Sequence, residues 1–560
     1  MNVINSLLSS IYKDSIDNVI IGQIHQRITE AKSHISHTRK QRWDEKDVVL
    51  ITYADQFYQP EKKTLTCLTD FYNAGLSAVF NIVHLLPFYP YSSDDGFSVI
   101  DYYQVNPIAG DWQDIAKLHH STRLMFDYVC NHMSAQSEWF RGYLAQQPEY
   151  DNFFVSMDPN IDLSAVTRPR TSPLLTPFPL KDGSTRHIWT TFSADQIDLN
   201  FANPKVLVAM LDVLLEYLKQ GADYIRLDAV GFMWKTPGTR CIHLEKTHLL
   251  VKLFRAVTDI VAPGSVIITE TNVPHQDNIA YFGNGHDEAQ MVYQFPLPPL
   301  VLHAIHTGSA RTLGQWAASL DLNTTDTTFF NFLASHDGIG LNPLRGLLPE
   351  EEILALVEDL QREGALVSYK NNPDGSRSPY EINVTYMDAL NRQDSQDDER
   401  IARFLLAHAI LLAFPGVPAV YIQSILGSRN DYDGVKSAGH NRAINRQKYS
   451  LDDINQAIAG KNYLRHQIFH QLSRLIEVRK SHSAFHPNCP LVIHHSPQEV
   501  LAFSREAPNG QRVMALFNLS SAACPVDLPA AEYTNLLTAE TLSTTSPYVM
   551  QPYQFLWLNY

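Results

Sequence analysis

The sequence has few cysteines, an excess of acidic over basic residues, and no long unbroken apolar run. Its five cysteines are scattered over 560 residues without a C-x-x-C pair, which indicates neither a disulfide framework nor a zinc or redox motif. Lys and Arg number 44 against 59 Asp and Glu, a net charge of −15 that disfavours nucleic acid or an anionic membrane as a partner. An anionic ligand would therefore need cations placed locally.

Membrane and targeting segments are also missing. The apolar stretch that begins at Arg403, RFLLAHAILLAFPGVPAVYIQSIL, is interrupted by Pro415, Gly416 and Pro418, whereas a membrane helix needs about 20 apolar residues. We expect a buried helix, a turn and a strand there instead. The first residues, MNVINSLLSSIYKDSIDN, lack the basic and apolar regions of a signal peptide. These absences predict a cytoplasmic protein.

Short β-rich runs alternate with helical patterns along most of the chain. Segments such as PKVLVAMLDVLLEYLKQ have the spacing of helices that cover a sheet. Eight such β/α units predict an α/β fold, a (β/α)8 or TIM barrel. The eight runs cover residues 47–54, 79–86, 123–130, 222–230, 265–270, 289–295, 328–337 and 418–424.

Two segments are too long to be simple crossovers. They follow the third and the seventh run, where the loops of a barrel form its active face. After about residue 484, alternating runs such as EVLAFSR predict a small antiparallel β-domain, and an amphipathic helix is expected at 17–42. We therefore predict an N-terminal helical extension (1–44), a catalytic barrel (45–130, 203–337 and 401–483), an inserted B domain (131–202), a second insertion (338–400) and a C-terminal β-domain (484–560).

Charged residues gather where four of the runs end. One charged residue at a strand end can be explained as a salt bridge or a helix cap. Acidic residues at the ends of four strands are not easily explained in that way. Because the strands of a barrel end on one face, we expect these side chains to face one another. The third run gives Asp127, Asn131 and His132, the fourth Arg226 and Asp228, the fifth Glu270, and the seventh His336 and Asp337.

Three converging carboxylates suit the transfer of a glycosyl group. One attacks the anomeric carbon, a second donates a proton to the leaving oxygen, and a spacing of about 5–5.5 Å between them gives retention of configuration. We expect Arg226 to keep Asp228 ionised, and crowding by other carboxylates to keep a proton on Glu270. A metal ion is the rival explanation, but the sequence has no DxDxDG or HExxH motif, so we expect neither a metal nor a cofactor.

Four segments in order, FDYVCNH, YIRLDAV, IITE and FLASHD, resemble the shared regions of the α-amylase superfamily, glycoside hydrolase family 13. The resemblance implies that the insertion after the third strand is the B domain of that family. It also implies roles for individual residues: nucleophile for Asp228, general acid/base for Glu270, transition-state stabiliser for Asp337, and sugar binding for His132, Arg226 and His336.

Longer segments, including HLLPFYPYSSDDGFSVIDY, DLSAVTRPR, PYEINVTYMDAL and AINRQKYS, resemble the sucrose phosphorylases within that superfamily, over most of residues 45–485. That resemblance implies phosphorolysis of a small α-glucoside, with inorganic phosphate as the second substrate. A guanidinium fork and a phenol hydroxyl suit a phosphate dianion. The implied glucose pocket consists of Asp94, Phe97, Gln196 and Arg446, and the implied phosphate site of Arg170 and Tyr380.

Two positions depart from the sucrose phosphorylase pattern, since Asn272 stands where His is expected and Glu381 where Gln is expected. Both would face the leaving group, which points away from sucrose as the substrate. ETNVPH, YKNNPDG and YIQSILGSRNDY resemble glucosylglycerate phosphorylases, which implies conversion of 2-O-α-D-glucosyl-D-glycerate and phosphate to α-D-glucose 1-phosphate and D-glycerate. Candidate groups for the anionic acceptor are Arg168, Arg170, Arg377 and Asn272.

Several alternatives share the same catalytic residues. Phosphorylases of sucrose, sucrose 6′-phosphate or glucosylglycerol would have almost the same motifs, and an α-glucosidase or transglucosidase would differ only in what ends the reaction. A non-enzymatic member of the family is not indicated, because such members lose the nucleophile or the acid. The partners are therefore expected to be small-molecule substrates, without nucleic acid or membrane.

Overall fold

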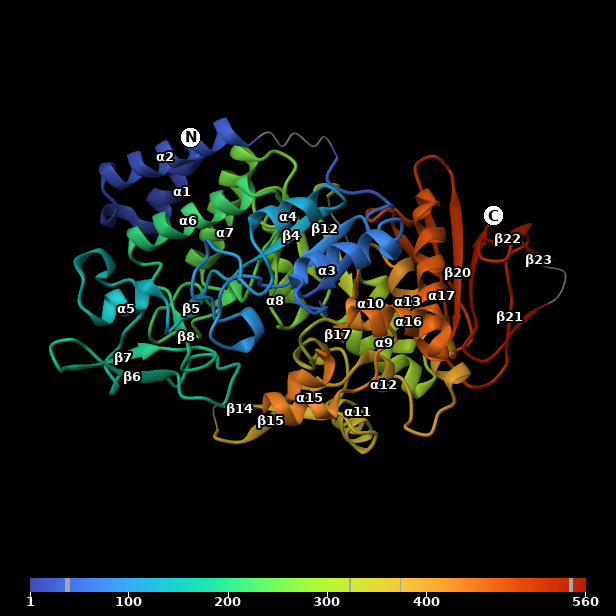
Figure 1. Ribbon diagram of the computed structural model, residues 1–560. Helices are drawn as coiled ribbons and strands as arrows, with labels where there is room; N and C mark the ends of the chain where they lie inside the picture. The colour runs from blue at the N-terminus through green and yellow to red at the C-terminus, as the bar shows by residue number, and fades with distance from the viewer. Residues whose placement is uncertain (36–40, 322–323, 373, 543–546) are drawn as a thin grey trace.

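Eight parallel strands form a closed barrel at the centre of the protein (Figure 1). The computed structural model describes residues 1–35, 41–321, 324–372, 374–542 and 547–560. Each strand neighbours the next one along the chain, and β16 pairs with β1 to close the barrel. All eight coincide with the predicted runs: β1 (Val49–Thr52), β3 (Ile82–Leu85), β4 (Arg123–Tyr128), β9 (Ala222–Leu227), β10 (Val266–Thr269), β11 (Met291–Tyr293), β12 (Thr328–Phe332) and β16 (Val417–Tyr421).

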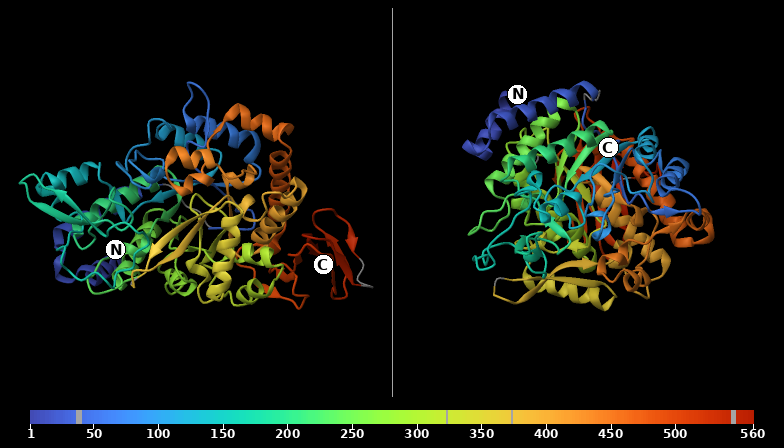
Figure 2. Two further views of the ribbon diagram at one scale, coloured as in Figure 1. Left: turned by 90° about the horizontal axis from the view of Figure 1, so that it is seen from below. Right: turned by 60° about the vertical axis from the view of Figure 1, so that its left-hand side comes forward.

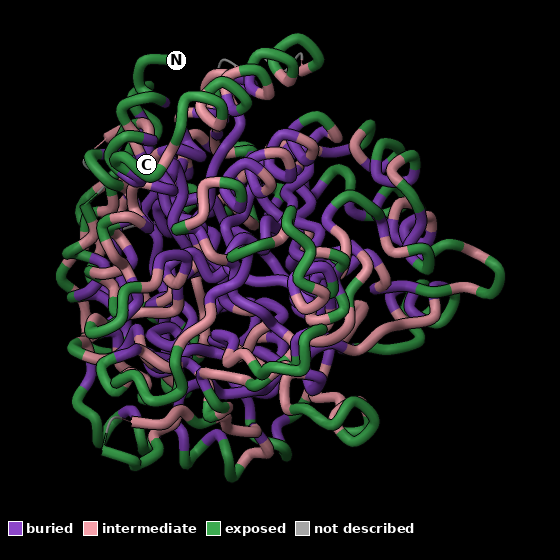
Figure 3. Tube along the Cα trace, turned by 90° about the vertical axis from the view of Figure 1, so that its left-hand side faces the viewer, coloured by how far each residue is buried: buried purple, intermediate pink, exposed green. Residues whose placement is uncertain are grey.

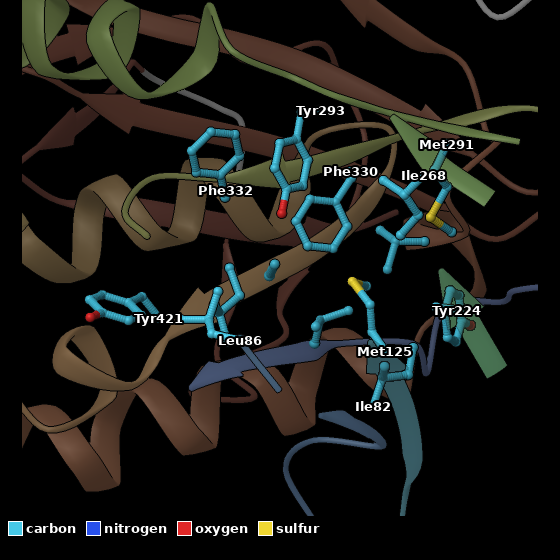
Figure 4. Close-up of a cluster of buried hydrophobic side chains, with 14 of the residues drawn as sticks. Ile82, Leu86, Met125, Tyr224, Ile268, Met291, Tyr293, Phe330, Phe332 and Tyr421 are labelled. Atoms are coloured by element: carbon cyan, nitrogen blue, oxygen red, sulfur yellow. The ribbon is translucent and has the colours of Figure 1, made fainter. Parts of the chain in front are cut away.

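Apolar side chains from successive strands fill the barrel, as Figure 4 shows. Met125 of β4, Ile268 of β10 and Met291 of β11 are fully buried there. Tyr293 stacks on Phe330 with ring centroids 4.6 Å apart. Because strands covered on both faces bury all their side chains, these segments read as continuous apolar runs rather than as alternating ones.

Helices surround the barrel, and their sequences explain where they begin. In α6 (Pro204–Lys219) the side chain of Asn203 accepts from the amide of Lys205, and Pro204 takes the first turn, where no amide hydrogen is needed. The predicted buried helix before the last strand is α13 (Asp397–Ala413), and it is confirmed. Other helices that cover the barrel are α4 (Trp112–His119), α7 (Glu245–Val261), α9 (Leu297–Thr307) and α17 (Tyr463–Lys480).

The two long insertions meet on one side of the molecule (Figures 1 and 2). Between β4 and α6 the chain forms β5 (His132–Ser134), paired with β8 (Gln196–Asp198), and the hairpin of β6 (Leu175–Pro179) and β7 (Thr185–Trp189). After β12 it forms a three-stranded sheet in the order β13 (Ile339–Gly340), β15 (Arg377–Asn383), β14 (Leu366–Asn371). The side-chain amide of Asn371 donates to the backbone carbonyl of Thr171 at 3.4 Å, and this hydrogen bond joins the two insertions.

Both ends of the chain pack against the barrel. At the N-terminus α1 (Asn2–Tyr12) and α2 (Asn18–His34) lie on α6 and α7, with exposed outer turns (Figure 3). The sequence predicted one helix at 17–42, which corresponds to α2, and did not predict α1. Part of the predicted helix lies outside the described residues. Predicted strands near the C-terminus are confirmed in a six-stranded antiparallel sheet of β18 (Leu491–Ile493), β19 (Val500–Glu506), β20 (Arg512–Asn518), β25 (Phe555–Asn559), β22 (Tyr533–Asn535) and β23 (Thr541–Leu542).

We propose the predicted residue boundaries as the domain division of the chain. Across the described ranges, no helix is long and apolar enough to span a membrane.

Candidate active site

A cavity of about 860 Å³ opens where the barrel strands end. Its lining comes from the segments that follow β4, β9, β10 and β12 and from both insertions. This is the face on which barrel enzymes place their reactive groups. The three predicted catalytic acids all line it: Asp228 follows β9, Glu270 follows β10, and Asp337 lies five residues beyond the end of β12.

A guanidinium lies beneath two of these acids. Arg226 is 1% exposed, and its Nη1 donates to Oδ1 of Asp228 at 2.8 Å and also to Asp127. Its Nη2 is 3.8 Å from Oε2 of Glu270. His84 contacts the other oxygen of Asp127 at 2.6 Å. The Arg and Asp of YIRLD are therefore buried together as one network, which supplies the partners that buried charges need.

Burial raises the pKa of Asp228, and the charge of Arg226 only partly opposes it. This corrects the expectation that Arg226 keeps Asp228 ionised. Burial is the largest cause, and the nearby charges of Glu270 and Asp127, which Arg226 also contacts, raise the pKa of Asp228 further. Burial also raises the pKa of Glu270, with the charge of Asp337 adding to it. Interacting carboxyl groups titrate as a pair, so together they retain a proton to higher pH than an isolated carboxyl would.

Backbone geometry links the same two acids. Ala229, directly after Asp228, has φ of +49°, a left-handed conformation that is uncommon for alanine. Its N–H donates to Oε2 of Glu270 at 3.2 Å. Backbone strain of this kind is concentrated at functional sites.

Asp337 has a different electrostatic environment, set by an arginine that the sequence analysis missed. Nη1 of Arg442 is 2.6 Å from Oδ1 of Asp337, and its Nε and Nη2 bind Glu381 at 3.0 and 2.8 Å. Burial by itself raises the pKa of Asp337, but Arg442 and His336 lower it, and the net pKa lies below its ordinary value. Arg442 directly precedes the segment AINRQKYS, so the motif indicated the neighbourhood but not this residue.

Five of the predicted sugar-pocket residues line the cavity and contact one another, whereas Arg226 lies beneath the acids and is not among the lining residues. Nε2 of Gln196 donates to Oδ2 of Asp94 at 3.0 Å, and Nε2 of His132 is 3.0 Å from the carbonyl of Phe97. The ring of Phe97 stacks on that of His336 with centroids 4.8 Å apart.

The prediction that Arg446 belongs to the glucose pocket is corrected, because Arg446 is not among the lining residues. It lies behind them, where its Nε donates to the carbonyl of His336 at 2.8 Å and its Nη1 donates to Asp95 at 2.5 Å. Arg446 therefore holds the loop of Asp95 rather than presenting its charge to the cavity.

The lining also carries four cationic residues, Arg168, Arg170, Arg240 and Lys370, which we call the cationic rim. The guanidinium of Arg170 lies 5.7 Å from the centre of the Tyr380 ring, so this predicted pair is together. Arg168 donates to the carbonyl of Ser172. Within the described ranges none of the four makes an ion pair with a carboxylate.

The acceptor-side predictions are met in part. Asn272 and Glu381 line the cavity, and the side chain of Asn272 fits against Gly340, where an added Cβ would come within 2.4 Å of it. Arg377 is a further correction: it begins β15, is exposed, and does not line the cavity. The sequence analysis missed Arg240 and Lys370, because nothing in their local sequence distinguishes them from surface cations. In the part of the chain that the structure describes, no cluster of His, Cys, Asp or Glu is arranged to hold a metal ion.

Comparisons with known proteins identify the family of the chain. The model of the α-amylase catalytic domain matches residues 76–339. Over 560 residues the chain is 58% identical to glucosylglycerate phosphorylase of Escherichia coli (strain K12), covering 99% of both proteins. The chain belongs to the α-amylase family. Its membership of the sucrose phosphorylase-like group, predicted from the motifs, is also confirmed, with sucrose phosphorylases as more distant relatives.

Two further proteins show how far the similarity extends. Glucosylglycerate phosphorylase of Allomeiothermus silvanus is 48% identical over 522 residues, which cover 93% of this chain and 92% of that protein. The crystal structure of sucrose 6F-phosphate phosphorylase from Thermoanaerobacter thermosaccharolyticum matches with a TM-score of 0.76 at 26% identity, covering 90% of this chain and 98% of that one. The (β/α)8 fold is thereby confirmed.

We expect Arg442→Gln to lower the free energy of unfolding by about 3–5 kcal/mol near pH 7, because it leaves buried carboxylates without their counter-charge. In the wild type Asp337 has a lowered pKa, so its contribution to stability is present at neutral pH and is lost below about pH 4. In the variant burial raises the pKa of Asp337, so this carboxyl takes up a proton as the pH falls from about 7 to about 5. The difference in free energy of unfolding between variant and wild type should therefore shrink over that range. Urea unfolding at both pH values measures this.

The matched control is Arg345→Gln. Arg345 pairs with Glu350 at 3.0 Å at the surface, where the side chains are 33% and 48% exposed. The decrease in the free energy of unfolding should therefore stay below about 1 kcal/mol. An Arg442→Gln deficit no larger than that of the control, or one independent of pH, would contradict the assigned electrostatics.

Proposed function

We propose that the protein is a retaining phosphorylase that converts 2-O-α-D-glucosyl-D-glycerate and inorganic phosphate to α-D-glucose 1-phosphate and D-glycerate. The observation that carries the proposal is one cavity lined both by Asp228, Glu270 and Asp337 and by the cationic rim. The first group suits glycosyl transfer and the second suits small anions. Similarity to glucosylglycerate phosphorylases over the full chain supports the same reaction.

In the first half-reaction Glu270 donates its proton to the glycosidic oxygen while a carboxylate oxygen of Asp228 attacks the anomeric carbon. The bond from that carbon to the glycerate oxygen breaks, its electron pair stays with the oxygen, and a β-linked glucosyl ester forms on Asp228. In the second half-reaction a phosphate oxygen attacks the same carbon and Glu270 takes its proton. The ester bond to Asp228 breaks, and two inversions leave the product in the α configuration.

The position of the proton on the acid pair determines which group attacks. Productive chemistry needs the proton on Glu270 and the charge on Asp228. Arg226 favours this arrangement, because it donates to Asp228 at 2.8 Å but approaches Glu270 only to 3.8 Å. Asp337, whose lowered pKa keeps it ionised, can accept hydrogen bonds from the glucose hydroxyls.

Arg170 and Tyr380 form the proposed phosphate site. Arg170 offers a planar fork of donors, its charge is not neutralised by a carboxylate of the described residues, and Tyr380 brings a hydroxyl donor beside it. Because Arg170 belongs to the first insertion and Tyr380 to the second, the site forms only where the insertions meet.

The proposal is tested by incubating the purified protein with glucosylglycerate, glucosylglycerol, sucrose or sucrose 6′-phosphate, each with and without phosphate, and assaying glucose 1-phosphate. We expect phosphate-dependent glucose 1-phosphate from glucosylglycerate. If glucose 1-phosphate forms only from one of the other glucosides, the acceptor is the group released from that glucoside and not D-glycerate. Free glucose released at the same rate without phosphate would identify a hydrolase and overturn the proposal.

Glu270→Gln should slow the cleavage of glucosylglycerate by about 10²–10⁴-fold, since general acid catalysis contributes that much. An activated aryl α-glucoside, whose leaving group needs little protonation, should be affected far less. Single-turnover rates on the two substrates measure the difference. Equal losses on both would argue against the acid role.

Arg170→Ala should raise the KM for phosphate by about tenfold, corresponding to a lost charge-assisted contact of about 1.4 kcal/mol. The KM for the glucoside should change much less, because Arg170 acts after the glucosyl ester has formed. Initial rates at varied phosphate measure the effect, and Arg377→Ala, which removes an exposed cation outside the cavity, is the control. An unchanged phosphate dependence would rule out the assigned role.

A further inference from the structure

The second insertion places a lysine in the cavity that neither the proposed acid chemistry nor the phosphate site uses. Lys370, on β14, lines the cavity, and its ammonium donates to Oδ1 of Asn342 at 3.0 Å. An ammonium has three donors, so others remain for a ligand. Lys370 is in no ion pair with a described carboxylate, and Glu350, the acid that acts on its pKa, is bonded instead by Arg345 at 3.0 Å.

Asn342 connects this lysine to the chain segment that follows Glu270. Its Nδ2 donates to the backbone carbonyl of Asn272 at 3.4 Å, and Asn272 stands two residues after Glu270. The side chain of Asn272 also lines the cavity, and its Oδ1 is buried without a hydrogen-bond partner among the described residues. We call Lys370, Asn342 and Asn272 the acceptor wall.

The acceptor wall carries a positive charge that is not neutralised. Burial lowers the pKa of Lys370 and the charge of Arg345 lowers it further, whereas Glu350 acts in the opposite direction. Arg226 and Arg442, by contrast, each contact two or more carboxylates. A half-buried ammonium without a counter-charge is stabilised when a small anion binds beside it.

We infer that Lys370, positioned by Asn342, binds the carboxylate of a small hydroxy-acid acceptor. This rests on the proposed function. Phosphate and glycerate enter the acceptor side in turn, and a cation shared by both would not distinguish between them. Because Arg170 with Tyr380 and the acceptor wall are separate sets of donors, Lys370 determines the preference for a hydroxy acid over a neutral polyol.

The experiment runs the reaction in the synthetic direction, with glucose 1-phosphate as donor and D-glycerate or glycerol as acceptor. Lys370→Gln should raise the KM for D-glycerate by about tenfold, equivalent to about 1.4 kcal/mol. In phosphorolysis the KM for phosphate should change by less than about twofold, because a different set of groups binds it. The KM for glycerol should not rise, and Lys370→Arg, which keeps the charge, should recover most of the glycerate affinity.

Arg377→Gln is the matched control, since it removes a cation from the same hairpin but outside the cavity and should leave both KM values unchanged. Thermal unfolding of each variant shows whether the hairpin is intact. An unchanged KM for D-glycerate in Lys370→Gln, or equal increases for glycerate and phosphate, would overturn the inference. If the wild type makes no glucose 1-phosphate from glucosylglycerate, the proposed function fails as well; if it does and Lys370→Gln is unaffected, only the inference fails.

Discussion

The active face depends on one buried guanidinium. Arg226 connects the floor of the cavity to the barrel interior, because it binds Asp127 at the end of β4, Asp228 after β9 and, at longer range, Glu270 after β10. Removing three carboxylates from water would be costly without it. Burial raises the pKa of Asp228, and the charge of Arg226, which also contacts Asp127 and Glu270, lowers it without offsetting burial.

Positive charge is distributed in two distinct ways around the cavity. Arg226 and Arg442 are bonded to carboxylates and set their protonation, whereas the cationic rim of Arg168, Arg170, Arg240 and Lys370 has no such partners in the described chain. In a protein with a net charge of −15, unpaired cations at one cavity are unusual and indicate anionic ligands. In the proposed reaction the carboxylates transfer the sugar, and the cationic rim selects the acceptor.

Both insertions are required to form the cationic site beside the carboxylates. The first contributes Arg168 and Arg170, the second contributes Lys370 and Tyr380, and a hydrogen bond between Asn371 and Thr171 holds them together. Loops that are supported by a rigid barrel can vary without disturbing the strands beneath. A change of acceptor is therefore expected to need changes in the insertions and at Asn272, while the carboxylate floor stays the same.

The sequence by itself determined the eight strands, the two insertions and the three acids, because periodicity, loop length and strand-end charges are local properties of the chain. It also placed the protein in its family through short contiguous motifs. Only the tertiary structure decided that Arg442 rather than Arg446 lines the cavity, and that Lys370 enters it while Arg377 on the same hairpin does not. Those distinctions arise from contacts between segments far apart in the sequence, such as Arg442 with Asp337, and no local pattern records them.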